Sequence, residues 1–99
     1  MFFTKSDVPV ILSAFSVFRK CYFLFDVPEN APDFLDALEV KLKSLSVLTI
    51  FTKAELIAIA NSFQCSILFL ESRKKKVPRE FYLLGQKFAE YFSKHLASE

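Results

Sequence analysis

The feature that most constrains the fold is a long stretch that is apolar on nearly every side. It begins with Thr52-Lys53-Ala54-Glu55, a capping box in which the Thr and Glu side chains bond each other's backbone N–H groups. Apolar residues then continue at helical spacing on two faces to about Ser72. A helix that lacks a polar face has to be covered by other elements. The sequence therefore predicts a central helix over residues 52–72.

Three further segments combine helical spacing with start or stop signals. The first covers residues 6–25, with Ser6 as the expected N-cap, so that Pro9 falls in the first turn, where its missing N–H is harmless. The second covers about 32–45 and carries acidic residues early and lysines late, as the helix dipole favours. The fourth covers about 78–97. Its apolar stripe consists of Phe81, Leu84, Phe88, Phe92 and Leu96.

The turn-forming residues are too few for a β-rich fold. One glycine and four prolines argue against a sandwich or barrel and exclude a glycine-rich phosphate loop. Residues 46–51 are rich in β-branched side chains, but no second convincing strand is present to pair with them. We predict an all-α fold, a compact antiparallel bundle of four main helices in one domain over 1–99. The runner-up is an α+β fold with a short strand at 46–51 that pairs across a dimer.

Composition and cysteine usage indicate a folded protein of a reducing compartment. Hydrophobic residues make up 53% of the chain and the net charge is +2, which excludes a disordered chain. The apolar runs 8–18 and 56–70 are too short or too polar for a membrane span, and no signal-peptide pattern is present. Cys21 and Cys65 are isolated in apolar surroundings, as is typical of reduced thiols. We therefore expect a cytoplasmic protein with no membrane span.

The sequence offers no arrangement of side chains for catalysis or metal binding. His95 is the only histidine, and a nucleophilic pair would need Cys21 or Cys65 beside it. Both cysteines lie on apolar helix faces, where a thiolate is disfavoured. One histidine and two separated cysteines also lack the spacing of a zinc site. We predict that the protein is not an enzyme and has no cofactor or metal.

A cluster of cations follows the central helix and is the candidate site for an anion or an acidic partner. It consists of Arg73, Lys74, Lys75, Lys76 and Arg79. Such a cluster is typical of a solvated helix end, because cations favour the negative end of the helix dipole. It also fits nucleic acid or an acidic protein surface. The cluster occupies one loop and lacks an accompanying recognition helix. A nucleic-acid-associated regulator that uses loop 73–79 is therefore the alternative function.

The first and third segments carry more apolar surface than one small bundle covers easily. A spare face needs a cover, and the candidates are Phe2-Phe3, the 46–51 connector, another copy of the chain or a different protein. On the first helix one face carries Val8, Leu12, Phe15, Phe18 and Tyr22, and the other carries Val10, Ala14, Val17, Cys21 and Leu24.

We predict that the second of these faces forms a homodimer interface near Val10, Val17 and Leu24, because a two-fold contact needs only one self-complementary patch. The predicted function is a non-enzymatic protein–protein interaction module. It would be a small regulator, inhibitor or immunity-type factor that acts through an apolar helical face.

Overall fold

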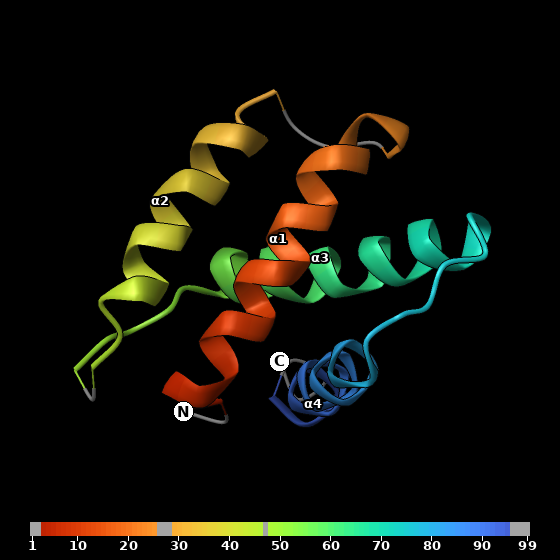
Figure 1. Cartoon of the computed structure of the whole chain (residues 1–99). Helices are drawn as coiled ribbons and strands as arrows, with labels where there is room; N and C mark the ends of the chain where they lie inside the picture. Colours follow the sequence, from red (N-terminus) through yellow and green to blue (C-terminus); the bar gives the residue numbers. More distant parts are fainter. Residues whose placement is uncertain (1–2, 26–28, 47, 96–99) are drawn as a thin grey trace.

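A computed structural model describes residues 3–25, 29–46 and 48–95, and these residues form helices and loops without a strand. The prediction of an all-α fold with four main helices is confirmed (Figure 1). The helices are α1 (Val8–Cys21), α2 (Ala31–Lys43), α3 (Lys53–Ser72) and α4 (Arg79–His95), and two 3₁₀ turns, η1 (Lys5–Asp7) and η2 (Tyr22–Leu24), flank α1.

The segment predicted as a possible strand is a loop in its described residues. The Thr49 N–H donates to the Ser46 carbonyl at 3.1 Å, which closes a turn. Val47 lies outside the described residues. No strand is present in the described ranges to pair with this loop, so the α+β runner-up is wrong for them.

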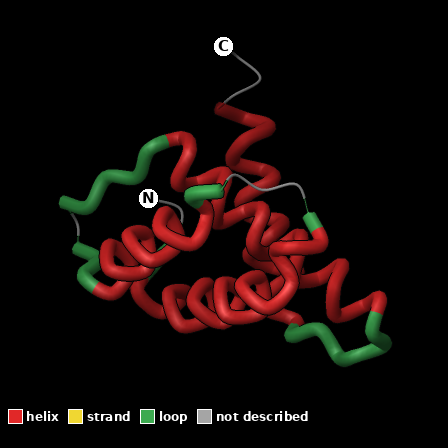
Figure 2. The backbone as a smooth tube through the Cα atoms, turned by 90° about the horizontal axis from the view of Figure 1, so that it is seen from above, coloured by secondary structure: helices red, strands yellow, loops and turns green. Residues whose placement is uncertain are grey.

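α1 and α4 pack on α3, and α2 packs mainly on α1. In Figure 1, α1 crosses in front of α3, α2 runs beside α1 in the opposite direction, and α4 is seen nearly end-on below α3. After a 90° turn, the C-terminal end of α4 extends beyond the other helices (Figure 2). The chain therefore crosses its helices over one another, and only α1 and α2 lie alongside in opposite directions.

The start of α1 differs by one residue from the prediction. The N-cap is Asp7 and not Ser6, because the 3₁₀ turn η1 precedes the α-helix. The Asp7 N–H donates to the Thr4 carbonyl at 3.0 Å, and the Thr4 N–H donates to the Asp7 carboxylate at 3.0 Å. Pro9 thereby takes the second position of α1, where no hydrogen bond is lost.

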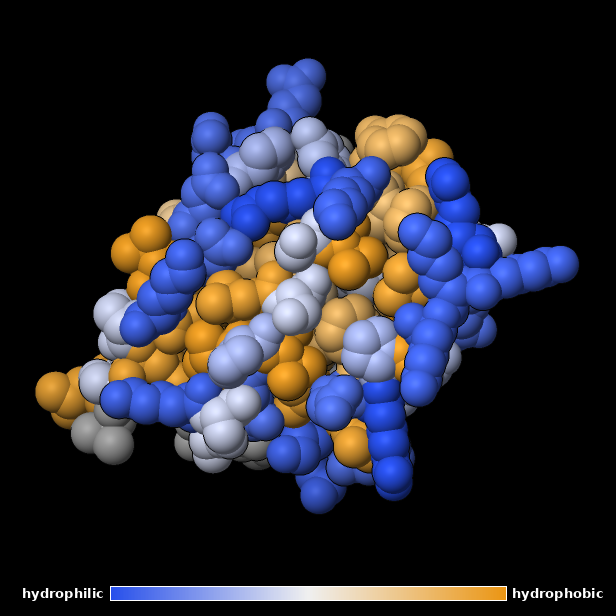
Figure 3. Space-filling view, in the orientation of Figure 1, coloured by the Kyte–Doolittle hydropathy of each residue, from blue (hydrophilic) through white to orange (hydrophobic). Residues whose placement is uncertain are grey.

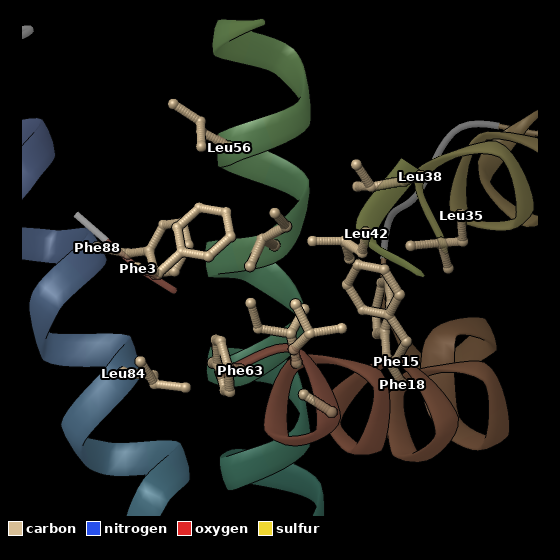
Figure 4. Close-up of a cluster of buried hydrophobic side chains, with 14 of the residues drawn as sticks. Phe3, Phe15, Phe18, Leu35, Leu38, Leu42, Leu56, Phe63, Leu84 and Phe88 are labelled. Atoms are coloured by element: carbon tan, nitrogen blue, oxygen red, sulfur yellow. The ribbon is translucent and has the colours of Figure 1, made fainter. Parts of the chain in front are cut away.

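The core lies on two sides of α3 (Figure 4). The side chains on the α4 side include Phe3, Phe63, Leu84 and Phe88, and those on the α1–α2 side include Phe15, Phe18, Leu35, Leu38 and Leu42. Phe3 packs between Phe51 and Phe88, with ring centroids 5.4 and 5.7 Å away. Phe3 of the N-terminal arm is therefore part of the core. Phe2 and Leu96 lie outside the described residues.

Polar contacts hold α1 to both of its neighbours. The Arg19 guanidinium bonds the carboxylates of Asp36 and Glu39 on α2, at 2.8 and 2.7 Å. The Ser66 hydroxyl of α3 donates to the Ala14 carbonyl of α1 at 3.0 Å, and both residues are fully buried. Because both side chains are small, the two backbones approach closely at this crossing.

The predicted capping box at the start of α3 is confirmed. The Glu55 N–H donates to the Thr52 hydroxyl at 3.1 Å, and the Thr52 N–H donates to the Glu55 carboxylate at 2.8 Å. The Lys41 ammonium of α2 donates to the same carboxylate oxygen at 2.8 Å. This one carboxylate therefore caps α3 and ties α2 to it.

Among the described helices, α3 alone is long and apolar enough to cross a membrane. The core helix of a soluble protein passes the same length and composition test, so this is weak evidence of a span. Only 28% of its most apolar 18-residue window is buried. Much of this helix therefore faces outward.

Candidate interaction surface on α3

The open apolar face belongs to α3 and not to α1. Both helices were expected to carry surplus apolar surface, but the buried residues of α3 all lie toward its partners: Leu56, Ile59, Ser62, Phe63 and Ser66. On its outer side, Ile57 is 37% exposed and Leu68 is 53% exposed. The prediction of a central helix holds for packing, because α1 and α4 both contact α3. The helix is not surrounded.

A hollow between the outer sides of α3 and α4, which we call the α3–α4 groove, has a volume of about 490 Å³. It is lined by Ile57, Ala60, Asn61, Gln64, Ile67, Tyr82, Gly85, Gln86, Ala89 and Phe92. None of these side chains is charged. Small residues line it on both helices, and a Cβ added at Gly85 would meet the Phe63 Cβ at 3.7 Å, so the two helices are close there.

Neutral hydrogen-bonding groups lie along the α3–α4 groove. They are the amides of Asn61, Gln64 and Gln86 and the hydroxyl of Tyr82. The Tyr82 hydroxyl donates to Glu71 at 3.2 Å. Partial loss of solvation and the nearby Glu71 charge raise the pKa of Tyr82, so the hydroxyl keeps its proton at neutral pH. The groove thus offers polar contacts without charge.

A second hollow, which we call the α2–α3 pocket, has a volume of about 540 Å³. It is lined by Phe18, Phe25, Asn30, Ala31, Phe34, Leu35, Ala54, Ile57, Ala58, Asn61 and Cys65. Ile57 and Asn61 belong to both hollows. The α2–α3 pocket and the α3–α4 groove therefore share one wall on the outer side of α3.

The sequence predicts that both cysteines are buried, and the structure bears this out for Cys21 but not for Cys65. Cys21 is buried, Cys65 is half-buried, and neither forms a disulfide. Burial raises the pKa of the Cys21 thiol; it also raises that of Cys65, to which the nearby Cys21 adds a smaller effect. The described residues contain no group of three potential metal ligands. His95 ends α4, and its side chain lies outside the described part of the chain.

The predicted interface residues on α1 are spread along the helix. Val10 and Val17 are half-buried, and Leu24 is 56% exposed in η2, next to the exposed Phe23. Two other members of the same predicted face, Ala14 and Cys21, are fully buried. Figure 3 shows apolar surface along α1 and at the end where η2 follows, broken by hydrophilic side chains. Homodimerisation through this face stays a prediction.

Val10 borders a hollow of about 410 Å³ between α1 and α4 that has an acidic rim. Three carboxylates, from Asp7, Glu80 and Glu90, and one ammonium, from Lys87, line it. Two copies that met at Val10 would therefore bring like charges together, which opposes a two-fold contact there.

The predicted basic cluster is exposed and lies at the C-terminal end of α3 and in the loop that follows it. The N–H groups of Lys74 and Lys75 donate to the carbonyls of Glu71 and Leu70 at 3.0 and 2.9 Å, the pattern of a Schellman motif. Lys74 has φ 56°, in the left-handed region. The guanidinium of Arg73 lies over the Phe69 ring, 4.9 Å from its centroid.

Sequence reasoning missed the α3–α4 groove and the α2–α3 pocket. A partial signal for the second exists in Phe34, an apolar side chain that stands outside the leucine stripe of α2. Comparisons of the chain with protein-family models, curated proteins and solved structures gave no match.

Proposed function

We propose that this protein is a non-enzymatic interaction module that holds an amphipathic helix of a partner protein in the α3–α4 groove. The observation that carries the proposal is the charge-free groove beside the outward apolar side of α3. Recognition of an amphipathic helix by an apolar groove is a recurring mode of protein binding.

The dimensions and chemistry of the groove favour a helix as the occupant. The groove follows α3 from Ile57 to Ile67, which is about 15 Å at the rise of an α-helix, room for about three helical turns. Ala60, Gly85 and Ala89 have small side chains, which let a third helix approach closely. The amides of Asn61 and Gln64 are available to the polar edge of such a helix. The partner's contacting face is therefore expected to be apolar and uncharged.

A different protein fits the groove better than a second copy of this chain. The exposed large apolar residues outside the groove and the outer side of α3 are Phe23, Leu24, Val40, Leu48, Ile50 and Leu83. They lie in a 3₁₀ turn, in a loop or singly on a helix. Within the described ranges no other helix presents an exposed stripe at i, i+3 and i+4 spacing that would fill the groove.

Binding of a library of short amphipathic helices that differ in the size and spacing of their apolar residues tests the proposal. We expect selected peptides to bind the parent chain. They should bind the Ala89→Lys variant about tenfold or more weakly, because this change puts a charge into the groove. The control is Ala37→Lys, which changes an exposed alanine of α2 outside both hollows. Isothermal titration calorimetry measures the affinities.

Two results would contradict the proposal. One is a library in which every bound peptide binds Ala89→Lys as tightly as the parent chain. The other is a dimer, seen by sedimentation, that Ala89→Lys dissociates and Ala37→Lys leaves intact, because the groove would then belong to a second copy.

A nucleic-acid-associated role for the basic loop is the second candidate. It is supported by five exposed cations at 73–79 that form no ion pair within the described residues. Replacing Lys74, Lys75 and Lys76 by Gln should lower the salt dependence of retention on duplex DNA by about 0.9 per lost phosphate contact. The fold should change by less than about 0.5 kcal/mol, because exposed charges contribute little. A parent chain that is not retained at low salt would exclude this role.

A further inference from the structure

The α2–α3 pocket has the size and walls of a site for a small molecule. Its volume of about 540 Å³ lies within the range of known ligand sites, about 300–1,000 Å³. Phe18, Phe25 and Phe34 line it from three different segments, α1, the residue after η2, and α2. Ala54 and Ala58 of α3 also line it. Aromatic rings with small side chains beside them leave space that a flat or slender apolar molecule fills.

The described polar groups of the pocket are few and neutral. Asn30 and Asn61 are the amides in its lining, and neither side chain makes a hydrogen bond within the described residues. Asn30 stands at the N-cap position of α2, yet its side chain does not cap the helix. Cys65 carries its proton at neutral pH, because burial raises its pKa. None of the described side chains that line the pocket is positively or negatively charged.

We infer that the α2–α3 pocket binds a small, uncharged, largely apolar molecule with an aromatic or short aliphatic body and a neutral hydrogen-bonding group. The rings contact the body of the ligand, and the amides of Asn30 and Asn61 bond its polar group. A carboxylate or sulfonate ligand would lose its hydration without gaining a cation from the lining, which disfavours anions. The inference concerns a different hollow from the α3–α4 groove, with which the pocket shares only Ile57 and Asn61 among the described residues.

Two fluorescent probes with the same aromatic body distinguish a neutral site from a general sticky surface. N-phenyl-1-naphthylamine is neutral, and 8-anilinonaphthalene-1-sulfonate carries a sulfonate on the same skeleton. We expect the neutral probe to bind at one site and about tenfold or more tightly than the sulfonate. Equal affinity, or binding of many probe molecules per chain, would overturn the inference.

Two matched alanine substitutions locate the bound probe. Ala54→Phe fills the pocket from an exposed position of α3, and Ala37→Phe adds the same ring at an exposed position of α2 outside both hollows. We expect Ala54→Phe to weaken the neutral probe by about tenfold or more and Ala37→Phe to leave its affinity within about twofold. Unchanged affinity in a folded Ala54→Phe would overturn the site. Because Ala54 does not line the α3–α4 groove, the peptide test of the proposed function is independent of this one.

Labelling of Cys65 tests the same site in the unaltered chain, so the result does not depend on a variant that folds. N-ethylmaleimide is small and neutral, and the modified peptide is identified by mass spectrometry. We expect saturating N-phenyl-1-naphthylamine to slow the labelling of Cys65 at least about fivefold, because this thiol lines the pocket. Cys21 is fully buried and serves as the internal control. Labelling of Cys65 at the same rate with and without the probe would overturn the inference.

Discussion

At the residue scale, Lys74 occupies a backbone position that suits glycine. Its φ of 56° lies in the left-handed region, which costs an L-residue about 1–2 kcal/mol. It is the residue at which the Schellman motif closes α3, where glycine is the usual choice. We expect Lys74→Gly to raise the free energy of unfolding by about 1 kcal/mol in urea titrations. Lys75→Gly is the control, because Lys75 lacks a positive φ, and it should lower stability slightly. A Lys74→Gly chain no more stable than the parent would show that the turn is relaxed in solution.

A comparison of two buried serines on α3 tests the hydrogen bond between α1 and α3. Ser66 donates to the Ala14 carbonyl of α1, whereas Ser62 donates to the Ala58 carbonyl of its own helix at 2.8 Å. Both changes to Ala gain the same helix propensity. We expect Ser66→Ala to be less stable than Ser62→Ala by about 1 kcal/mol, because only Ser66→Ala removes a bond between α1 and α3. Equal melting curves for the two variants would contradict a bond at this crossing.

At the element scale, the sequence predicted where the helices start better than which of their faces other helices cover. The capping box at Thr52 marks the start of α3 correctly because it is made by residues that are adjacent in sequence. The predicted start of α1 was one residue too early, because a 3₁₀ turn precedes the α-helix. The open side of α3 was not predictable, because it depends on which of two apolar faces the other helices happen to cover.

The Lys41–Glu55 ion pair joins α2 to α3, and its contribution to the free energy of unfolding should depend on pH. Burial opposes ionisation of Glu55, but hydrogen bonds from Lys41 and Thr52 and the Lys41 charge outweigh it, so its pKa is lowered from 4.5. A lowered pKa in the folded state stabilises the fold above about pH 4.5, and this contribution is lost as the pH falls through the folded pKa. We expect Glu55→Gln to be less stable than the parent at pH 7, with a difference that shrinks toward pH 2. Glu29→Gln, at an exposed carboxylate without an ion pair in the described part, should show no such trend. A Glu55→Gln deficit that stayed constant from pH 7 to pH 2 would contradict this account.

At the scale of the whole molecule, the fold class followed from the sequence and the candidate surface did not. Scarce glycine and repeated helical spacing were enough for an all-α prediction. The helix crossings arise from pairs far apart in sequence, such as Ser66 with Ala14 and Gly85 with Phe63. Both hollows on α3 result from these crossings, so no local sequence pattern predicts where they lie. Only the surplus of apolar residues, noticed on the first and third segments, indicated that some face would stay open.

Self-association through the α1 face is expected to strengthen as the salt concentration is raised. A two-fold contact at Val10, Val17 and Leu24 would bring the carboxylates around Val10 near those of the second copy. Repulsion between them is strong at low salt and is screened as the Debye length falls from about 10 Å at 0.1 M to about 3 Å at 1 M. Sedimentation equilibrium should therefore show more dimer as NaCl is raised, and Leu24→Glu should remove the dimer.

The matched control for this prediction is Val40→Glu, because Val40 is 68% exposed on α2, away from the α1 face. It adds the same charge as Leu24→Glu and should leave the dimer unchanged. A chain that is monomeric at every salt concentration would contradict self-association altogether. A dimer that weakens as salt is raised would be held by opposite charges, and the exposed cations of loop 73–79 would then be the first place to look for its interface.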